Sequence, residues 1–165
     1  MLITEITRNL KAESTTKRQD CLQIEWYEST KRIQRLKTDE GMEIAIRLLG
    51  TNGRLQEGDI LYENDDKIVV VVIKPCEVIV IQIPDIPTIG FISCEIGNKH
   101  LPLFIEDNTL LLPFERPMFH WLESNGFDPQ RAERKLKNSL NANVDPSHHK
   151  SMRAATQKIK VLIKV

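Results

Sequence analysis

Residues 76–97, "CEVIVIQIPDIPTIGFISCEIG", begin with a strand-like pattern and continue with a helix-like one. This change of pattern is the best starting point for predicting the fold. The segment 76–83 is apolar and rich in β-branched residues, which predicts a buried strand. The segment 84–97 predicts a helix with an N-cap at Asp85, Pro87 in the first turn and Gly97 just past its end. Its predicted inner face comprises Ile86, Ile89, Ser93 and Ile96. A strand followed by a helix is therefore expected here.

The residues that follow extend this pattern. "LPLFI" (101–105) and "NTLLLPF" (108–114) predict two strands joined by a turn at 106–108. "RPMFHWLESNG" (116–126) predicts a second helix, beginning at Pro117 and ending at Gly126. "DPQRAERKL" (128–136) predicts a last strand. The resulting order β-α-β-β-α-β is the ferredoxin-like arrangement, which hosts many unrelated functions and so assigns no chemistry.

Residues 1–74 have the character of β-structure. Alternation of Leu22, Ile24 and Trp26 predicts one strand, and Ile33 with Arg35 and Lys37 on one face predicts a weaker one. Further strands are expected within 43–49 and 55–73, with turns at Gly50–Gly53 and Asn64–Asp66. Pro75 is a plausible hinge, because proline cannot donate to a sheet ladder.

We therefore predict an α+β chain with two domains and a tail. An all-β domain would span residues 1–74, a ferredoxin-like βαββαβ domain residues 75–140, and a flexible C-terminal tail residues 141–165. The tail prediction rests on the polar, turn-rich segment "NSLNANVDPSHHKS" (138–151).

Composition excludes several classes of protein. The formal net charge is zero, which argues against a dedicated binder of nucleic acid or of a membrane surface. No apolar run approaches the ~20 residues that span a bilayer. The three cysteines, Cys21, Cys76 and Cys94, form no C-x-x-C pair, and "MLITEITRNL" (1–10) lacks the apolar core of a signal peptide. We therefore expect a cytoplasmic protein with reduced thiols.

Catalytic patterns are weak, and we predict that the chain is not an enzyme. There is no glycine-flanked serine elbow and no phosphate-binding loop in the sequence. Cys94 precedes His100 by six residues, but a cysteine on a short helix usually packs against neighbours. The adjacent acids Glu106 and Asp107 are most simply solvated turn residues.

Metal binding is a better hypothesis, centred on His100 in "CEIGNKHLPLFIED" (94–107). Imidazole suits nickel, copper and zinc, but one histidine cannot hold an ion, so a plain turn residue is the competing interpretation. A two-fold axis would pair two copies of His100, and His148–His149 in the tail could complete the coordination sphere. His120 is expected to face solvent. Two adjacent histidines in a polar tail can also occur by chance, which is the competing interpretation of His148–His149.

Two stretches carry a resemblance to a known family. "IGNKHLPLFIE" (96–106) and "PFERPMFHWLESNGF" (113–127) resemble the urease accessory proteins of the UreE type, which are nickel metallochaperones with the hallmark G-N-[RK]-H-x-P-[LI]. "WYESTKRIQRLKTDEGME" (26–43) and "LQEGDIL" (55–61) are similar to stretches in the first half of that family. The resemblance covers roughly residues 1–140.

The resemblance implies a homodimer of two-domain subunits, with a β-rich peptide-binding-like first domain and a ferredoxin-like metal-binding second domain. His100 matches the family's interfacial nickel-binding histidine, and members deliver Ni(II) to urease apoprotein together with a GTPase and other accessory proteins. Because 108–114 contain no histidine and the tail offers only His148 and His149, about one site per dimer is expected. Zn(II) and Cu(II) should bind the same site, and loading should weaken as the pH falls towards ~6.5.

An alternative from a different class remains open. The chain could be an assembly adaptor that binds urease accessory proteins through its N-terminal domain, with metal binding incidental. A remoter alternative is a scaffold whose dimer is stabilised by Zn(II).

Overall fold

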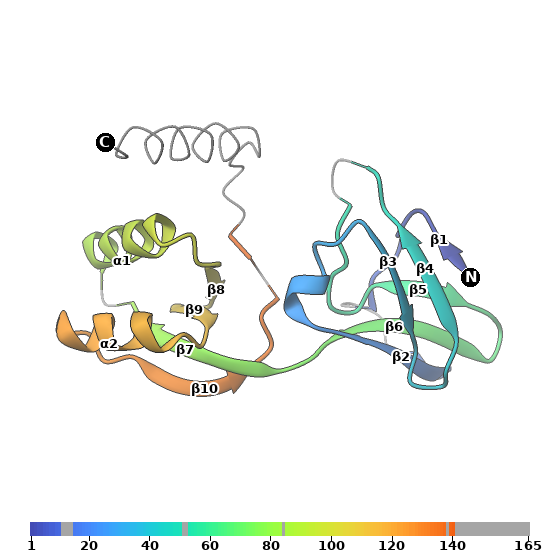
Figure 1. Cartoon of the computed structure of the whole chain (residues 1–165). Helices are drawn as coiled ribbons and strands as arrows, with labels where there is room; N and C mark the ends of the chain where they lie inside the picture. The colour runs from blue at the N-terminus through green and yellow to red at the C-terminus, as the bar shows by residue number, and fades with distance from the viewer. Residues whose placement is uncertain (11–14, 51–52, 84, 138, 141–165) are drawn as a thin grey trace, which may run out of the picture.

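The fold is described from a computed structural model, which describes residues 1–10, 15–50, 53–83, 85–137 and 139–140 (Figure 1). Within these residues the chain forms three sheets and two α-helices. The prediction of a mixed α+β fold is confirmed. No helix in this part of the chain is long and apolar enough to cross a lipid bilayer.

The N-terminal half is built from two three-stranded sheets with the orders β1-β4-β3 and β2-β6-β5. Strands β2 and β6 are parallel, and β3 and β4 are antiparallel. Apolar side chains from both sheets share one buried cluster, which includes Leu22, Ile44 and Val71. The bounds are β1 Leu2–Ile3, β2 Arg18–Ile24, β3 Ile33–Lys37, β4 Glu43–Arg47, β5 Ile60–Glu63 and β6 Lys67–Ile73.

Two expectations for this half are wrong in detail. Trp26 does not continue β2, because the chain turns after Ile24 and forms a 3-10 helix over Trp26–Glu28 that a capping box with Glu25 holds. Ile33 does not face the core either, since 69% of it is exposed. The half-buried residues of β3 are Gln34 and Leu36, so the single leucine of the strand sets its inner face.

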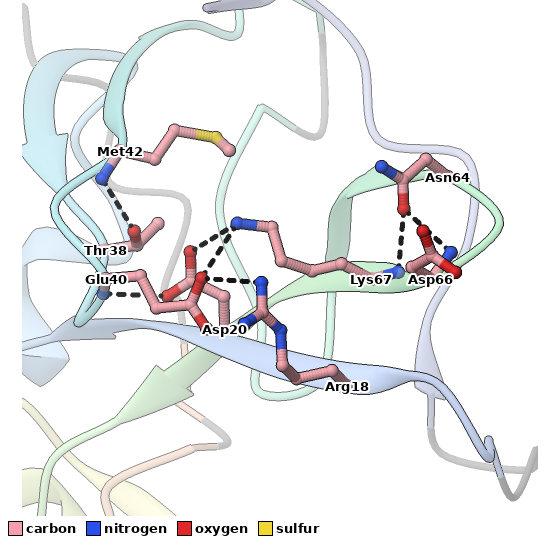
Figure 2. A network of polar contacts seen from close by, with 8 residues as sticks. All are labelled: Arg18, Asp20, Thr38, Glu40, Met42, Asn64, Asp66 and Lys67. Carbon is pink, nitrogen blue, oxygen red and sulfur yellow. Dashed lines mark hydrogen bonds and ion pairs between the residues drawn. The ribbon is translucent and has the colours of Figure 1, made fainter.

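A polar network joins the β3–β4 turn to the other sheet (Figure 2). Asp20 on β2 is 1% exposed and accepts hydrogen bonds from the backbone N–H of Glu40, at 3.1 Å, and from Nζ of Lys67, at 3.3 Å. Lys67 also donates to Glu40 at 3.1 Å, and the Thr38 hydroxyl accepts from the backbone N–H of Met42 at 3.0 Å. The turn is therefore held to β2 and β6 by several hydrogen bonds that share the groups of Asp20, Glu40 and Lys67.

The network also sets the ionisation of Asp20. Burial penalises the charged carboxylate, but hydrogen bonds from Thr38, the Glu40 backbone and Lys67 outweigh that penalty, so the pKa of Asp20 lies below its ordinary value. The pKa of Lys67 is raised, chiefly by its hydrogen bond to Glu40. Both groups are therefore charged at neutral pH.

The C-terminal half begins directly after β6, and Figure 1 shows one extended passage of chain from β6 into β7 through Lys74 and Pro75. Its strands form one antiparallel sheet with the order β10-β7-β9-β8, and the elements follow along the chain as β-α-β-β-α-β. The bounds are β7 Cys76–Gln82, α1 Ile86–Asn98, β8 Phe104–Glu106, β9 Thr109–Pro113, α2 Arg116–Ser124 and β10 Gln130–Arg134.

Both helices pack on the same face of this sheet. Ile79 and Ile81 of β7 and Leu110 and Leu112 of β9 form a buried cluster with helix residues. The helix residues of the cluster are Ile92, Ile96, Met118 and Leu122. The sheet therefore provides a rigid base for α1, whose end leads into the candidate site.

Candidate metal centre

Helix α1 starts as the sequence predicts. Asp85 is the N-cap, and its Oδ1 accepts a hydrogen bond from the backbone N–H of Thr88 at 2.7 Å. That bond lowers the pKa of Asp85. The buried face differs from the prediction, because Ile86 is 83% exposed and Ile92 is buried with Ile96. Ile92 and Ile96 are one i, i+4 step apart and therefore lie on the same side of the helix.

The end of α1 also differs from the prediction, and the difference concerns His100. Gly97 does not terminate the helix, which runs through it to Asn98 with Lys99 as C-cap. The N–H of His100 donates to the carbonyl of Gly97 at 2.9 Å, and the N–H of Leu101 donates to that of Ile96 at 3.2 Å. These two bonds form a Schellman motif, in which His100 is the C′ residue.

His100 has a backbone conformation that is uncommon for a side-chain-bearing residue. Its φ angle is +56°, in the left-handed region. This region costs an L-residue roughly 1–2 kcal/mol, although histidine visits it more often than most. Glycine would fill this position without that cost.

The two Schellman bonds fix the backbone around His100. The residue is exposed, while Leu101 directly after it packs on the cluster around Ile96. Exposure leaves the imidazole accessible to an ion or to a second protein. The competing interpretation of a turn residue describes the backbone correctly, and it does not exclude a ligand role for the ring.

The helix end has an aromatic support that sequence reasoning missed. Nζ of Lys99 lies 5.8 Å from the ring centroid of Trp121 on α2. Trp121 stacks with Phe91 of α1, at 5.8 Å between centroids, and with Phe127, at 6.3 Å. The residue before His100 is thus held against α2 by a cation–π contact. A lysine beside the histidine and a tryptophan on the second helix were visible in the sequence, but their proximity was not.

The other candidate groups do not form a cluster of three metal-ligating side chains with His100 in the described part of the chain. Nδ1 of His120 lies 3.0 Å from Oε2 of Glu123 on the exposed side of α2, as expected for a solvent-facing residue. The exposed thiol of Cys94 accepts from the amide of Asn98 at 3.8 Å, and Glu106 and Asp107 are exposed in the hairpin turn.

The part of one chain that the structure describes does not form a complete metal site by itself. Among the described residues, no three histidine, cysteine or acidic side chains come together as a metal site. His148 and His149 lie outside the described residues. Within the described residues His100 is therefore not part of a three-ligand cluster, and an imidazole fits an ion only if further ligands are added.

The amino-acid sequence of this chain is similar to those of known proteins. Residues 3–74 match the family model described as "UreE urease accessory protein, N-terminal domain". A urease accessory protein UreE of Flavobacterium johnsoniae is 45% identical over 150 residues, which cover 90% of this chain and 91% of that protein. The chain belongs to the UreE family of urease accessory proteins. The resemblance found in the sequence is confirmed.

More distant members of the UreE family match over similar lengths. The urease accessory protein UreE of Haemophilus influenzae strain PittGG is 40% identical over 84% of this chain and 76% of its own length. That of Acetivibrio thermocellus is 34% identical over 90% of this chain and 97% of its own length. A match of 150 residues in a chain of 165 must include residue 100. The segment with His100 therefore lies within the part shared with a UreE protein.

Proposed function

We propose that this chain is a nickel metallochaperone that delivers Ni(II) to urease apoprotein during assembly of the urease active site. The observation that carries the proposal is the similarity to a urease accessory protein over 90% of the chain, including the segment around His100. The relatives are accessory proteins by name, which supports a carrier and not an enzyme.

His100 would supply the protein ligand for nickel. One imidazole from each of two chains would bind the ion, with water or the tail residues His148 and His149 in the remaining positions. The exposed side chain at a rigid helix end supports this assignment, because a fixed backbone with an accessible ring suits an ion shared between copies. Few protein ligands and an open coordination shell favour release to a recipient.

The proposed working unit is a cytoplasmic homodimer of two-domain subunits. Residues 1–74 would form the first domain, 75–140 the ferredoxin-like metal-binding domain, and 141–165 a flexible tail. Two features support this division: the family match ends at residue 74, and the strands on either side of Pro75 belong to different sheets. Its partners would be urease apoprotein and urease accessory proteins, including a GTPase.

The site should not discriminate strongly among divalent ions. Imidazole ligands bind Cu(II) at least as tightly as Ni(II), and they also bind Zn(II), according to the Irving–Williams order. Selectivity for nickel would then come from the partners and from metal supply.

Urease activation in cells tests the proposal. Cells that lack their own copy of this protein are supplied with the wild type or with His100→Gly, and urease activity is measured at limiting and at excess nickel. We expect His100→Gly to fail at limiting nickel and to recover at excess nickel, where delivery is no longer needed. Full activation by His100→Gly at limiting nickel would contradict nickel delivery through this residue.

A second candidate function is supported by the distribution of histidine. All four histidines follow residue 74, so the half that matches the family model offers no imidazole. This favours a separate role for residues 1–74 as an adaptor that binds urease accessory proteins. The two roles are compatible, and the cell experiment separates them, because an adaptor alone would survive His100→Gly.

A further inference from the structure

Strand β3 is the outer strand of the sheet β1-β4-β3, and its backbone groups divide between its two sides. The carbonyl of Arg32 accepts from Leu48 at 2.8 Å, and the N–H of Thr38 donates to Met42 at 3.0 Å. Because bonded pairs alternate along an antiparallel ladder, Gln34 and Leu36 also bond to β4. The N–H and C=O groups of Ile33, Arg35 and Lys37 therefore point away from the sheet, towards an open edge.

The same three residues present their side chains on the outer face of the sheet. Ile33, Arg35 and Lys37 are exposed, whereas Gln34 and Leu36 turn towards the interior. An added strand would thus meet exposed side chains and backbone groups of the same residues, and these backbone groups bond to none of the other described residues. This is the arrangement that strand addition requires.

The charges on this face favour one kind of partner. Arg35 lies across from Ala45, and Ile33 lies across from Arg47. In the part of the chain that the structure describes, Arg35 and Arg47 have no ion pair, and Lys37 pairs only with Glu43, at 3.4 Å and with both side chains mostly exposed. An exposed pair of this kind is weak, so an incoming carboxylate can compete for the lysine.

A groove of about 580 Å³ lies beside these cations. It is lined by Met1, Arg35, Leu36, Lys37, Glu43, Ile44 and Ala45. Met1 and Leu2 lie at the opposite edge of the same sheet, on the other side of β4 from β3, and are 45% and 60% exposed. The groove lies on the β4 side of the cations, so that Arg35 and Lys37 border open space that also contacts Met1.

We propose that the β3 edge, defined by Ile33, Arg35 and Lys37, binds an extended acidic segment of a partner protein by strand addition. Acidic side chains of the segment would lie beside Arg35 and Lys37, and its backbone would bond to the three outward pairs of N–H and C=O groups. A second copy of this chain is a poor occupant, because pairing two β3 edges sets cations against cations.

The edge is held in place before any partner arrives. The turn that follows β3 is tied through Glu40 to Asp20 on β2 and to Lys67 on β6 (Figure 2). A fixed strand loses little conformational entropy on binding, so more of the contact energy appears as affinity. This surface gives the adaptor role a location and a class of ligand, and it does not depend on metal.

The test uses the metal-free full chain and a blocked peptide that alternates glutamate and threonine, with a matched lysine–threonine peptide as control. Binding is measured by fluorescence anisotropy, and amide exchange is measured at residues 33, 35 and 37. We expect the acidic peptide alone to bind and to protect those three amides.

Two variants of Arg35 distinguish the contribution of its charge to peptide binding from that of its backbone N–H. Arg35→Glu should weaken binding about tenfold through charge reversal. Arg35→Pro should also weaken it, because it removes an N–H that points outward and leaves the bonds to β4 intact. Arg116→Glu, which reverses an exposed cation on α2, should bind like the wild type.

The proposal is overturned by any of three results. These are absence of binding to the wild type at about 1 mM acidic peptide, equal binding of the lysine peptide, and equal binding by Arg35→Glu. Nickel binding by Arg35→Glu is measured in parallel. It should match the wild type, so that failure of this surface and failure of the metal site are distinguished.

Discussion

His100 occupies, at the end of α1, the position that Gly126 occupies at the end of α2. Both residues have positive φ angles, +56° and +80°, and both are the C′ residue of a Schellman motif. At α2 the N–H of Gly126 donates to Glu123 and that of Phe127 donates to Leu122, each at 3.1 Å. Glycine is the usual residue at such a position. The chain thus uses glycine at one helix end and an exposed histidine at the other.

Replacing His100 should therefore affect metal binding far more than stability. His100→Gly removes the left-handed strain and adds backbone entropy to the unfolded chain, and these two effects nearly cancel. We expect its free energy of unfolding to stay within about 1 kcal/mol of the wild type. His100→Ala keeps the strain and should be less stable than His100→Gly. Urea unfolding of the three proteins measures this order, and a large loss of stability in His100→Gly would contradict the assigned motif.

The matched substitution at α2 should have a clear cost. Gly126→Ala places a Cβ at a φ angle of +80°, although nothing lies within 4 Å of the added atom. We expect a loss of about 1 kcal/mol that comes from the backbone and not from a clash. Thermal unfolding measures it, and Gly90→Ala, within α1 and with equal space, is the control that should not destabilise.

The Asp20 network predicts a pH dependence of stability. The pKa of Asp20 is lower in the folded chain than in the unfolded chain, so the unfolded state binds the proton more readily. The stabilisation is fully present above the unfolded value of about 3.9 and is lost as the pH falls through the folded value. Asp20→Asn should cost about 2 kcal/mol at pH 7 and flatten the stability profile below pH ~4. If the free energy of unfolding depended on pH equally in Asp20→Asn and in the wild type, Asp20 would not be the source of this pH dependence.

The tail histidines should adjust affinity without creating the site. We expect the double variant His148→Ala, His149→Ala to bind about one Ni(II) per dimer, with a lower affinity than the wild type. Calorimetric titration measures both quantities. Unchanged affinity would exclude the two residues from the coordination sphere, and loss of all binding would make them, instead of His100, the principal ligands.

Sequence patterns predicted the elements better than their faces and ends. The strand 76–83, both helices and the Asp85 cap followed from local chemistry that acts within a few residues. The end of α1 did not, because Gly97 is a good terminator by propensity, and the helix continues where two Schellman bonds form one turn later. Ile33 was misplaced because Ile33 and Leu36 lie on opposite faces of an alternating strand, so the pattern does not reveal which face packs.

The sequence identified His100 as the candidate site residue, but it did not predict the contacts that surround this residue. His100 was singled out by its motif, whereas the Lys99–Trp121 contact depends on how α1 and α2 pack together. Contacts between residues that are distant in sequence are not encoded in any short pattern. The same limit applied to the Asp20–Lys67 pair, which joins residues 47 positions apart.

Nickel titration of the purified chain, with its mass in solution followed throughout, tests whether His100 holds the ion between two subunits. The wild type should bind about one Ni(II) per dimer, and His100→Gly should lose that tight site while it unfolds like the wild type. Tight stoichiometric binding by a correctly folded His100→Gly protein, or one tight site on an isolated monomer, would contradict the shared site.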